Sequence, residues 1–301
     1  MKTLFTRCYE QRLAALCLFA GLSWSAQAAP TGPAGSVLTL TGQVIDASTH
    51  EPVPYASLSV AGTPAGTVAD ALGRFQLKVP AQYSHDSLRV VLAGYRTYTA
   101  SVQDFQQQAC PTEAPCVVAL VPQPVQPADV AQPAGRVVRR TLGNADYLQT
   151  VPQLFPGNAP GIQVGQPIRV KRRAQLEEVS FLVARCTYEY AFFRLNVYPL
   201  AADGRPNEQR HLLPAPVYVR VDRSEQAQRV RLDLRQYGLT LEPGQEVAVC
   251  LELVSKPGSG ELELTNTAAN GFLLEKYSAS GPWTKVDNYG AGIAATVTEL
   301  R

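Results

Sequence analysis

The sequence predicts an all-β protein with two β-domains in tandem. Apolar residues recur at every second position over many short stretches, as they do in half-buried strands. The 22 glycines and 23 prolines favour turns between such stretches, and no segment after the N-terminal one sustains a helical period. The length of 301 residues suits two domains, and 46% hydrophobic residues are enough for two cores.

The N-terminal segment predicts export. Lys2, Arg7 and Arg12 precede an apolar run from Leu13 to Leu22, and small residues follow up to Ala28. This pattern indicates a signal peptide over residues 1–28. A membrane anchor is disfavoured because the run is shorter than the ~20 residues of a spanning helix. We therefore expect a protein of the periplasm, the outer-membrane periphery or the extracellular space, without a membrane span after cleavage.

The charge of the mature chain argues against nucleic acid as a partner. The formal net charge of +2 equals that of the signal segment, which has three basic residues and one acid, Glu10. The remainder is neutral, whereas nucleic-acid binding relies on Lys and Arg that neutralise phosphates. The short basic runs at Arg139-Arg140 and 171–173 are typical of solvated turns.

Alternation and turn residues define the first domain. Apolar residues alternate over 56–60 and 75–79, and glycine-containing turns at 62–66 and 70–73 separate these two runs. Pro52 and Pro54 mark a connection or an edge, because proline cannot donate to a ladder. We expect strands near 37–45, 55–60, 67–69, 74–79, 88–93, 97–102 and 116–121.

A set of short motifs in this region carries a family resemblance. The motifs are Gly42-x-Val44, Glu51-Pro52-Val53-Pro54-Tyr55-Ala56, Gly62-Thr63, Gly66-Thr67, Gly73-x-Phe75 and Gly94-Tyr95. In this order they resemble the carboxypeptidase regulatory-like domain. That family is similar to the transthyretin-like accessory domain of some zinc carboxypeptidases and is frequent in bacterial cell-envelope proteins. The resemblance implies a seven-stranded sandwich over 37–121 and a non-catalytic role, and it names no ligand.

Cys110 and Cys116 predict a disulfide that closes this domain. In an exported protein, two cysteines in a short hairpin favour a bridge, which would contribute roughly 2 to 2.5 kcal/mol on the chain-entropy model. A metal site is the rival interpretation, but only Glu113 accompanies the pair, and four ligands would be needed.

Residues 122–160 are rich in Pro, Gln, Val and Ala, which indicates a linker. Proline-rich spacers are extended and partly stiff, so we expect the two domains to be held apart. The piece from Arg136 to Thr150 is compatible with a short strand or a helical turn.

The second domain, 161–301, shows the clearest alternation and suggests a jelly-roll-like sandwich. Turn residues at 202–206 and 242–245 separate neighbouring strands. The alternating apolar sets are Val179, Phe181, Val183; Phe193, Leu195, Val197; Val217, Val219, Val221; Val230, Leu232, Leu234; Val247, Val249, Leu251, Leu253; and Ile293, Ala295, Val297.

Cys186 and Cys250 occupy positions on the faces opposite these apolar sets. A cross-strand disulfide follows if their strands are neighbours, and two buried free thiols are the alternative. The sequence leaves both open.

No catalytic residue, metal site or cofactor site is predicted. The histidines His50, His85 and His211 are dispersed, and none begins the His-x-x-Glu pair of zinc carboxypeptidases. Nucleophile elbows, phosphate-binding glycine loops and calcium loops are also missing from the sequence. We therefore expect a protein that is not an enzyme.

Aromatic residues supply the candidate ligand site. Trp283, Asp287, Asn288 and Tyr289 fall in a loop-like stretch where a ring could stack on a sugar and polar groups could bind its hydroxyls. Ordinary packing in a sandwich is the alternative for such residues, and docking of another protein is a third. A second aromatic group comprises Tyr188, Tyr190, Phe192 and Tyr198.

Two functions follow from these observations. The first is an exported, non-catalytic scaffold or interaction module of the cell envelope, with an envelope protein or a surface glycan as partner. The second is a carbohydrate-binding protein that uses aromatic residues of the C-terminal domain.

Overall fold

The computed structural model describes residues 36–110, 115–123, 137–144, 150–157 and 159–300. The expected signal peptide lies outside these residues. The described chain is all-β, as predicted, and belongs to one compact unit, Gly35–Arg301. Within the described ranges, no helix has the length and apolar character needed to cross a membrane.

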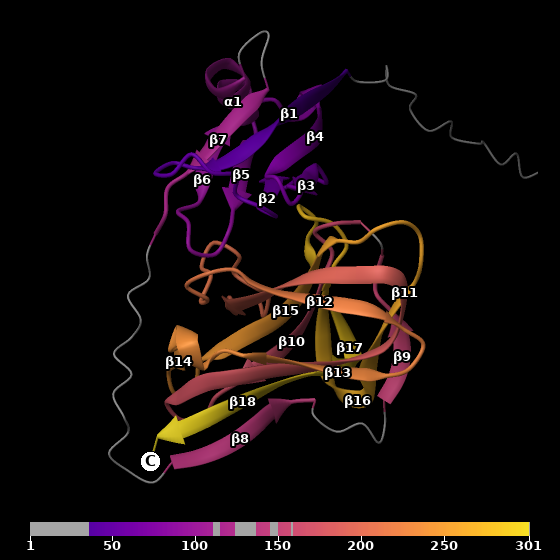
Figure 1. The fold of residues 1–301 in the computed structure, drawn as a ribbon. Coiled ribbons are helices and arrows are strands. Elements are labelled where there is room, and N and C mark those ends of the chain that lie inside the picture. The colour runs from indigo at the N-terminus through magenta and orange to yellow at the C-terminus, as the bar shows by residue number, and fades with distance from the viewer. Residues whose placement is uncertain (1–35, 111–114, 124–136, 145–149, 158, 301) are drawn as a thin grey trace, which may run out of the picture. The chain divides into compact units, whose positions relative to one another are not determined.

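The first part of the chain forms a sandwich-like pair of small sheets (Figure 1). One sheet has the order β4-β1-β7 and the other β3-β2-β5-β6. Both contribute to one core, in which Val44, Leu58, Leu77 and Val118 are fully buried. The strands are β1 (Val37–Asp46), β2 (Ser57–Val60), β3 (Gly66–Val68), β4 (Arg74–Pro80), β5 (Ser87–Val91), β6 (Tyr98–Ser101) and β7 (Cys116–Leu120).

Two glycines of the sequence motifs are required by close approaches in this core. β1 runs parallel to β7 with Gly42 opposite Cys116, and a Cβ atom at Gly42 would lie 2.2 Å from the Cys116 carbonyl oxygen. Gly73 has φ +71°, and its Cβ would lie 2.5 Å from the carbonyl oxygen of Val44. Close backbone contact therefore explains both motif positions.

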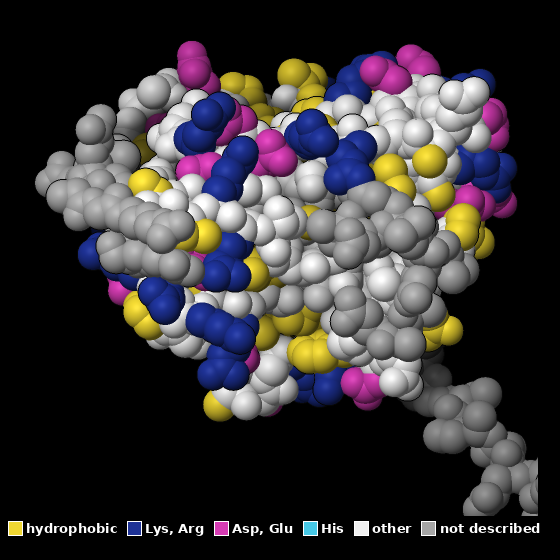
Figure 2. All heavy atoms as spheres, turned by 90° about the horizontal axis from the view of Figure 1, so that it is seen from below, with side chains coloured by type: hydrophobic (Ala, Val, Ile, Leu, Met, Phe, Trp, Pro, Cys, Tyr) yellow, Lys and Arg dark blue, Asp and Glu magenta, His cyan; other side chains and the backbone are white. Residues whose placement is uncertain are grey.

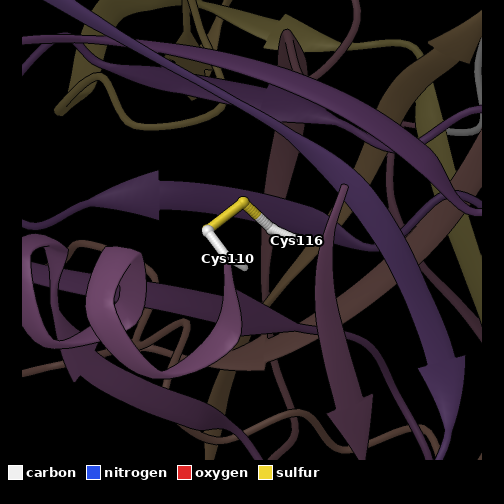
Figure 3. Close-up of a disulfide and its surroundings, with 2 residues drawn as sticks. All are labelled: Cys110 and Cys116. Atoms are coloured by element: carbon white, nitrogen blue, oxygen red, sulfur yellow. A yellow bond between two sulfur atoms is a disulfide. The ribbon is translucent and has the colours of Figure 1, made fainter. Parts of the chain in front are cut away.

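A short helix and a disulfide complete this part. Helix α1 (Val102–Ala109) was not expected; the Ser101 hydroxyl caps it by accepting from the Asp104 N–H at 2.9 Å. The helix buries Phe105 in the core and ends at Cys110, which is bonded to Cys116 at the start of β7 (Figure 3). The predicted Cys110–Cys116 disulfide is confirmed.

The second part forms one hydrogen-bonded sheet of eleven strands, which contains a six-stranded barrel. The sheet closes because β16 pairs with β10 and also with β11. Its main core includes Phe181, Phe193 and Leu251. The strands are β8 (Val137–Gly143), β9 (Thr150–Leu154), β10 (Gln163–Arg169), β11 (Ala174–Pro199), β12 (Val217–Ser224), β13 (Gln228–Asp233), β14 (Thr240–Leu241), β15 (Glu246–Ser255), β16 (Leu262–Lys276), β17 (Trp283–Ala291) and β18 (Ile293–Leu300).

The structure places strands within the segment that we expected to be a linker. β8 pairs antiparallel with β18, and β9 pairs antiparallel with β16. The C-terminal sheet therefore begins before Gly161. The proline-rich stretch 124–136 and residues 145–149 lie outside the described part of the chain.

The disulfide alternative for Cys186 and Cys250 is wrong, because both are buried free thiols. The register of β11 against β16 shifts between Val183 and Arg185, and Cys186 joins the main core beside Val183. Cys250 lies in a separate apolar cluster with Leu274 and Trp283. Strict alternation misplaced Cys186 because it does not anticipate such an irregularity.

Basic side chains on the surface are interspersed with acidic ones. Figure 2 shows a face on which dark blue and magenta side chains lie among one another. Arg139 and Arg140 pair with Glu177 and Glu299, and Arg173 pairs with Glu242. These pairs partly neutralise the short basic runs identified in the sequence.

Candidate functional site

A buried ion pair arises from the pairing of β11 with β15. The apolar side chains of Phe193 and Leu195 enter the main core, so the intervening Arg194 lies on the opposite face of the strand. The antiparallel register sets Arg194 directly across from Glu252. Opposite charges on facing positions of neighbouring strands attract each other.

Both carboxylate oxygens of Glu252 accept hydrogen bonds, and Arg194 supplies the opposite charge. The Arg194 guanidinium donates from Nη2 and Nε to Glu252 Oε2, at 2.6 and 3.2 Å. The same oxygen accepts from Asn196 Nδ2 at 2.7 Å, and Oε1 accepts from the Ser57 hydroxyl at 2.9 Å. The side chains of Arg194 and Glu252 are only 5% and 1% exposed. A pair buried this deeply persists only when its remaining hydrogen-bonding groups also find partners.

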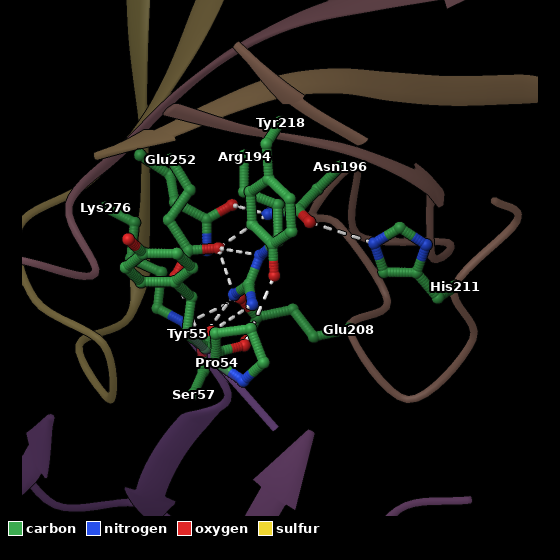
Figure 4. Close-up of polar contacts among 11 residues, drawn as sticks. Pro54, Tyr55, Ser57, Arg194, Asn196, Glu208, His211, Tyr218, Glu252 and Lys276 are labelled. Atoms are coloured by element: carbon green, nitrogen blue, oxygen red, sulfur yellow. Dashed lines mark hydrogen bonds and ion pairs between the residues drawn. The ribbon is translucent and has the colours of Figure 1, made fainter. Parts of the chain in front are cut away.

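Residues of the first part of the chain complete this cluster (Figure 4). Arg194 Nη1 donates to the Tyr55 carbonyl oxygen and Nη2 to the Ser57 hydroxyl, each at 2.5 Å. Tyr55 has φ +58°, a strained conformation for a residue other than glycine. The rings of Tyr55, Phe192 and Tyr218 pack with centroids 5.3 to 5.4 Å apart. Tyr55 and Ser57 thus bring the first sheet system into contact with β11.

His211 extends the cluster as a neutral imidazole. Asn196 uses its amide hydrogens on Glu252 and Gln163, so its Oδ1 accepts from His211 Nε2 at 2.9 Å. His211 Nδ1 accepts from the Leu213 N–H at 3.2 Å. The network therefore assigns the Nε2–H tautomer and leaves no place for a second proton.

The pKa shifts agree with this arrangement. Burial and the charge of Arg194 lower the pKa of His211 to about 3. Burial alone would raise the pKa of Glu252, but the Arg194 charge and the hydrogen bonds from Arg194 and Asn196 hold it below its usual value. Burial raises the pKa of the Cys250 thiol well above its usual value. At neutral pH these groups are a carboxylate, a neutral imidazole and a thiol.

A second buried cation links the cluster to the surface. The Lys276 ammonium contacts Glu208 Oε1 at 2.5 Å, and the Lys276 side chain is 4% exposed. Glu208 is 36% exposed and reaches the wall of an open groove.

The groove consists of three adjoining hollows that share Val91 and Glu208. The two larger ones have volumes of about 310 and 250 Å3, and a smaller one of about 40 Å3 lies against Arg194 and His211. The larger volumes lie near the lower end of the range for small-molecule sites. The largest hollow is lined by Ser59, Arg89, Val91, Thr97, Thr99, Glu208 and Gln209.

The sequence-predicted ligand residues lie elsewhere, on β17. Trp283 is 6% exposed and packs with Tyr198, Leu274 and Cys250, so its ring has no open face for stacking. Asp287 is exposed and pairs with Lys285. Asn288 has φ +66°, and Tyr289 is exposed. The stretch is a strand rather than a loop, and it does not line the groove.

Arg194, Asn196, Glu252, His211 and Lys276 were not singled out as a site from the sequence. Arg194 and Asn196 alternate with core residues and have the pattern of a solvated face. One signal could have identified them: Glu252 alternates with core residues on a second strand, as Arg194 does on the first, and carries the opposite charge. Among the described residues, no group of three or more His, Cys, Asp or Glu side chains could hold a metal ion.

Comparison with known families confirms that the first part of the chain resembles the carboxypeptidase regulatory-like domain. Residues 40–114 match the family model of the CarboxypepD_reg-like domain. The match covers less than half of the chain and includes Tyr55 and Ser57 but none of the C-terminal cluster. No curated protein matches the sequence.

Solved structures show only distant similarity. The cysteine protease and lectin-like domains of Cwp84, a surface layer associated protein of Clostridium difficile, align with a TM-score of 0.39 and 11% identity over 54% of this chain and 36% of that chain. This chain thus spans little more than a third of that structure. A VP2 protein of infectious bursal disease virus aligns with a TM-score of 0.25 and 11% identity, over 88% of this chain and 78% of that chain. A putative membrane-associated protein of unknown function from Bacteroides fragilis aligns with a TM-score of 0.21 and 13% identity, over 89% of this chain and 98% of that chain. TM-scores this low do not establish a shared fold.

Proposed function

We propose that this chain is an exported, non-catalytic binding module of the cell envelope. The observation that carries the proposal is a groove that is lined by the charged residues Arg89 and Glu208 and whose smallest hollow lies against the buried, fully partnered Arg194. The CarboxypepD_reg-like part supplies one wall, and the segment 208–213 of the C-terminal part supplies the other. We include in this proposal a tandem arrangement in which a transthyretin-like sandwich precedes a jelly-roll-like domain.

The titratable groups in and beside the Arg194 cluster suit binding rather than catalysis. General acid–base catalysis works best with a pKa near the operating pH. Burial and the Arg194 charge lower the pKa of His211 to about 3, and the Glu252 carboxylate binds Arg194 and Asn196. Cys250 is held as a thiol, which is a poor nucleophile. These groups are suited to fixing the shape of a site.

Site-specific photo-crosslinking in the source cell tests the proposal. A photoreactive amino acid at Thr99, which is exposed on β6 within the groove, should yield one defined adduct in the envelope fraction. The same group at the exposed Thr284 on β17, outside the groove, serves as the matched control. Identical adduct patterns from both positions, or none from Thr99, would contradict a binding groove. Mass spectrometry of the exported chain should show an N-terminus after Ala28.

A carbohydrate ligand remains the second candidate, although not through Trp283. The buried ring removes the basis for stacking at that residue. What favours a sugar is instead the number of hydroxyl and amide side chains along the groove, from Ser59, Thr97, Thr99 and Gln209.

A further inference from the structure

We infer that the groove beside β5 binds an oligosaccharide that carries a carboxylate, with Arg89 as the residue that recognises the acid. This inference rests on the proposed binding function and names the class of ligand. It is carried by one wall of the groove, where the Arg89 guanidinium lies between hydroxyl groups.

The wall is the outer face of the sheet β3-β2-β5-β6. Leu58 and Leu88 point from this sheet into the core, so the alternate side chains point away from it. Ser59 faces Arg89 across β2 and β5, and Arg89 faces Thr99 across β5 and β6. The three side chains therefore form a cross-strand row within the largest hollow.

Arg89 is the positive centre of this row. Its side chain is half-buried, and no ion-pair partner is found for it among the residues that the structure describes. A planar guanidinium can bind a carboxylate through two parallel hydrogen bonds. The hydroxyls of Ser59 and Thr99 on either side can donate to or accept from neighbouring sugar hydroxyls.

The opposite wall supplies acceptors. Lys276 holds Oε1 of Glu208, and no residue in the described part of the chain pairs with Oε2, which can therefore accept from a hydroxyl group. The Gln209 side chain lines the same hollow and offers both an amide donor and a carbonyl acceptor. A ligand that spans the groove must therefore be anionic near Arg89 and rich in hydroxyls near Glu208.

A sugar fits this wall better than a peptide does. Peptides that bind sheets commonly add a strand to an unpaired edge. β5 is paired on both sides, by β2 and by β6, so at Arg89 the wall presents side chains and no free backbone, and the unpaired edges of this sheet lie at β3 and β6. Polar side chains directed off a sheet face match hydroxyl groups spaced along a sugar chain.

Isothermal titration calorimetry of the mature protein with an oligogalacturonate tests the inference. The matched ligand is the same oligosaccharide after reduction of its carboxylates to neutral alcohols. We expect the acidic form to bind at least about tenfold more tightly, with an affinity that falls as salt is added. Arg89→Gln should abolish this preference, and Arg89→Lys should retain part of it. Arg74→Gln, at an exposed position on β4, should leave binding unchanged.

Three outcomes would overturn the inference. These are equal affinity for the acidic and the reduced oligosaccharide, no binding of the acidic form at millimolar concentration, and an acidic peptide bound in its place. The comparison of the two ligands uses the unaltered protein, so it tests the preference for a carboxylate even if Arg89→Gln fails to fold. A defined protein adduct from Thr99 together with a blank titration would reject the sugar and retain the binding function.

Discussion

His211 combines a fixed tautomer with a neutral charge, and both follow from its two hydrogen bonds. Nε2 donates to Asn196 and Nδ1 accepts from Leu213, so protonation would place a hydrogen where an N–H already points. The positive Arg194 guanidinium further opposes a charge on the ring.

Stability should therefore fall as the pH drops from 6.5 towards 3. In this window the unfolded chain binds a proton at His211 and the folded chain does not, so the free energy of unfolding decreases with falling pH. The slope is at most about 1.4 kcal/mol per pH unit, and water that reaches the half-buried ring reduces it. Urea denaturation at pH 7, 6 and 5 measures this slope.

The variant His211→Gln should flatten the slope, because the titrating group is removed. His85→Gln, which changes an exposed histidine, is the matched control and should keep it. Below the unfolded-state pKa of Glu252 a further loss is expected, because the folded-state pKa of this carboxyl is lowered and its stabilisation disappears on protonation. An unaltered slope in His211→Gln would contradict the proposed neutral state.

Among the strands, β1 requires glycine at one position, Gly42. It lies between β4 and β7, and the parallel pairing with β7 brings Gly42 against the Cys116 backbone. A backbone atom cannot move aside as the end of a flexible side chain can.

Gly42→Ala should destabilise the protein by about 1 to 3 kcal/mol through overpacking. The new Cβ would start 2.2 Å from the Cys116 carbonyl oxygen, so β1 and β7 must separate. Thr41→Ala, at the neighbouring exposed position, should change stability by less than about 0.5 kcal/mol. The midpoint of chemical denaturation under oxidising conditions compares the two. Equal midpoints would show that the pairing tolerates a side chain.

Alternation predicted most strands but not what covers their polar faces. The apolar sets on β11 and β15 point into the main core, as expected for Phe181, Leu195 and Leu251. On β15, however, the intervening Ala248, Cys250 and Glu252 are buried as well. A period of two distinguishes the two faces of a strand, but it does not show whether a segment distant in sequence covers the polar face. The candidate site formed where such a cover exists, so it could not be read from the alternation alone.

At the scale of the whole molecule, the Arg194 cluster joins residues from both parts of the chain. Glu252 accepts from Ser57, and Arg194 donates to Tyr55 and Ser57, more than a hundred positions earlier in the sequence. The sequence indicated two domains and a spacer because each half has its own alternating pattern. The contacts that connect them involve few residues and leave no periodic signal.

Arg194→Met should destabilise the protein by about 3 to 5 kcal/mol, because it leaves the Glu252 carboxylate buried without its counter-ion. The double variant Arg194→Met/Glu252→Leu should recover much of this loss. Fluorescence of Trp283 reports on the C-terminal part, and hydrogen exchange in β2 reports on the first part.

We expect both probes to follow one transition in the unaltered protein and to separate in Arg194→Met. Arg235→Met, which breaks an exposed pair with Asp233, is the matched control and should have little effect. Coincident transitions and an unchanged midpoint in Arg194→Met would show that the cluster does not couple the two parts.

The left-handed backbone at Tyr55 has a consequence for engineering. The Tyr55 carbonyl oxygen and the nearby Ser57 hydroxyl accept hydrogen bonds from Arg194 in the C-terminal part. A chimera in which a foreign regulatory-like module replaces the first part would keep the buried Arg194 but lose these two acceptors. Exchange of modules should succeed only when the donor brings an equivalent turn and hydroxyl, or when Arg194 and Glu252 are replaced together.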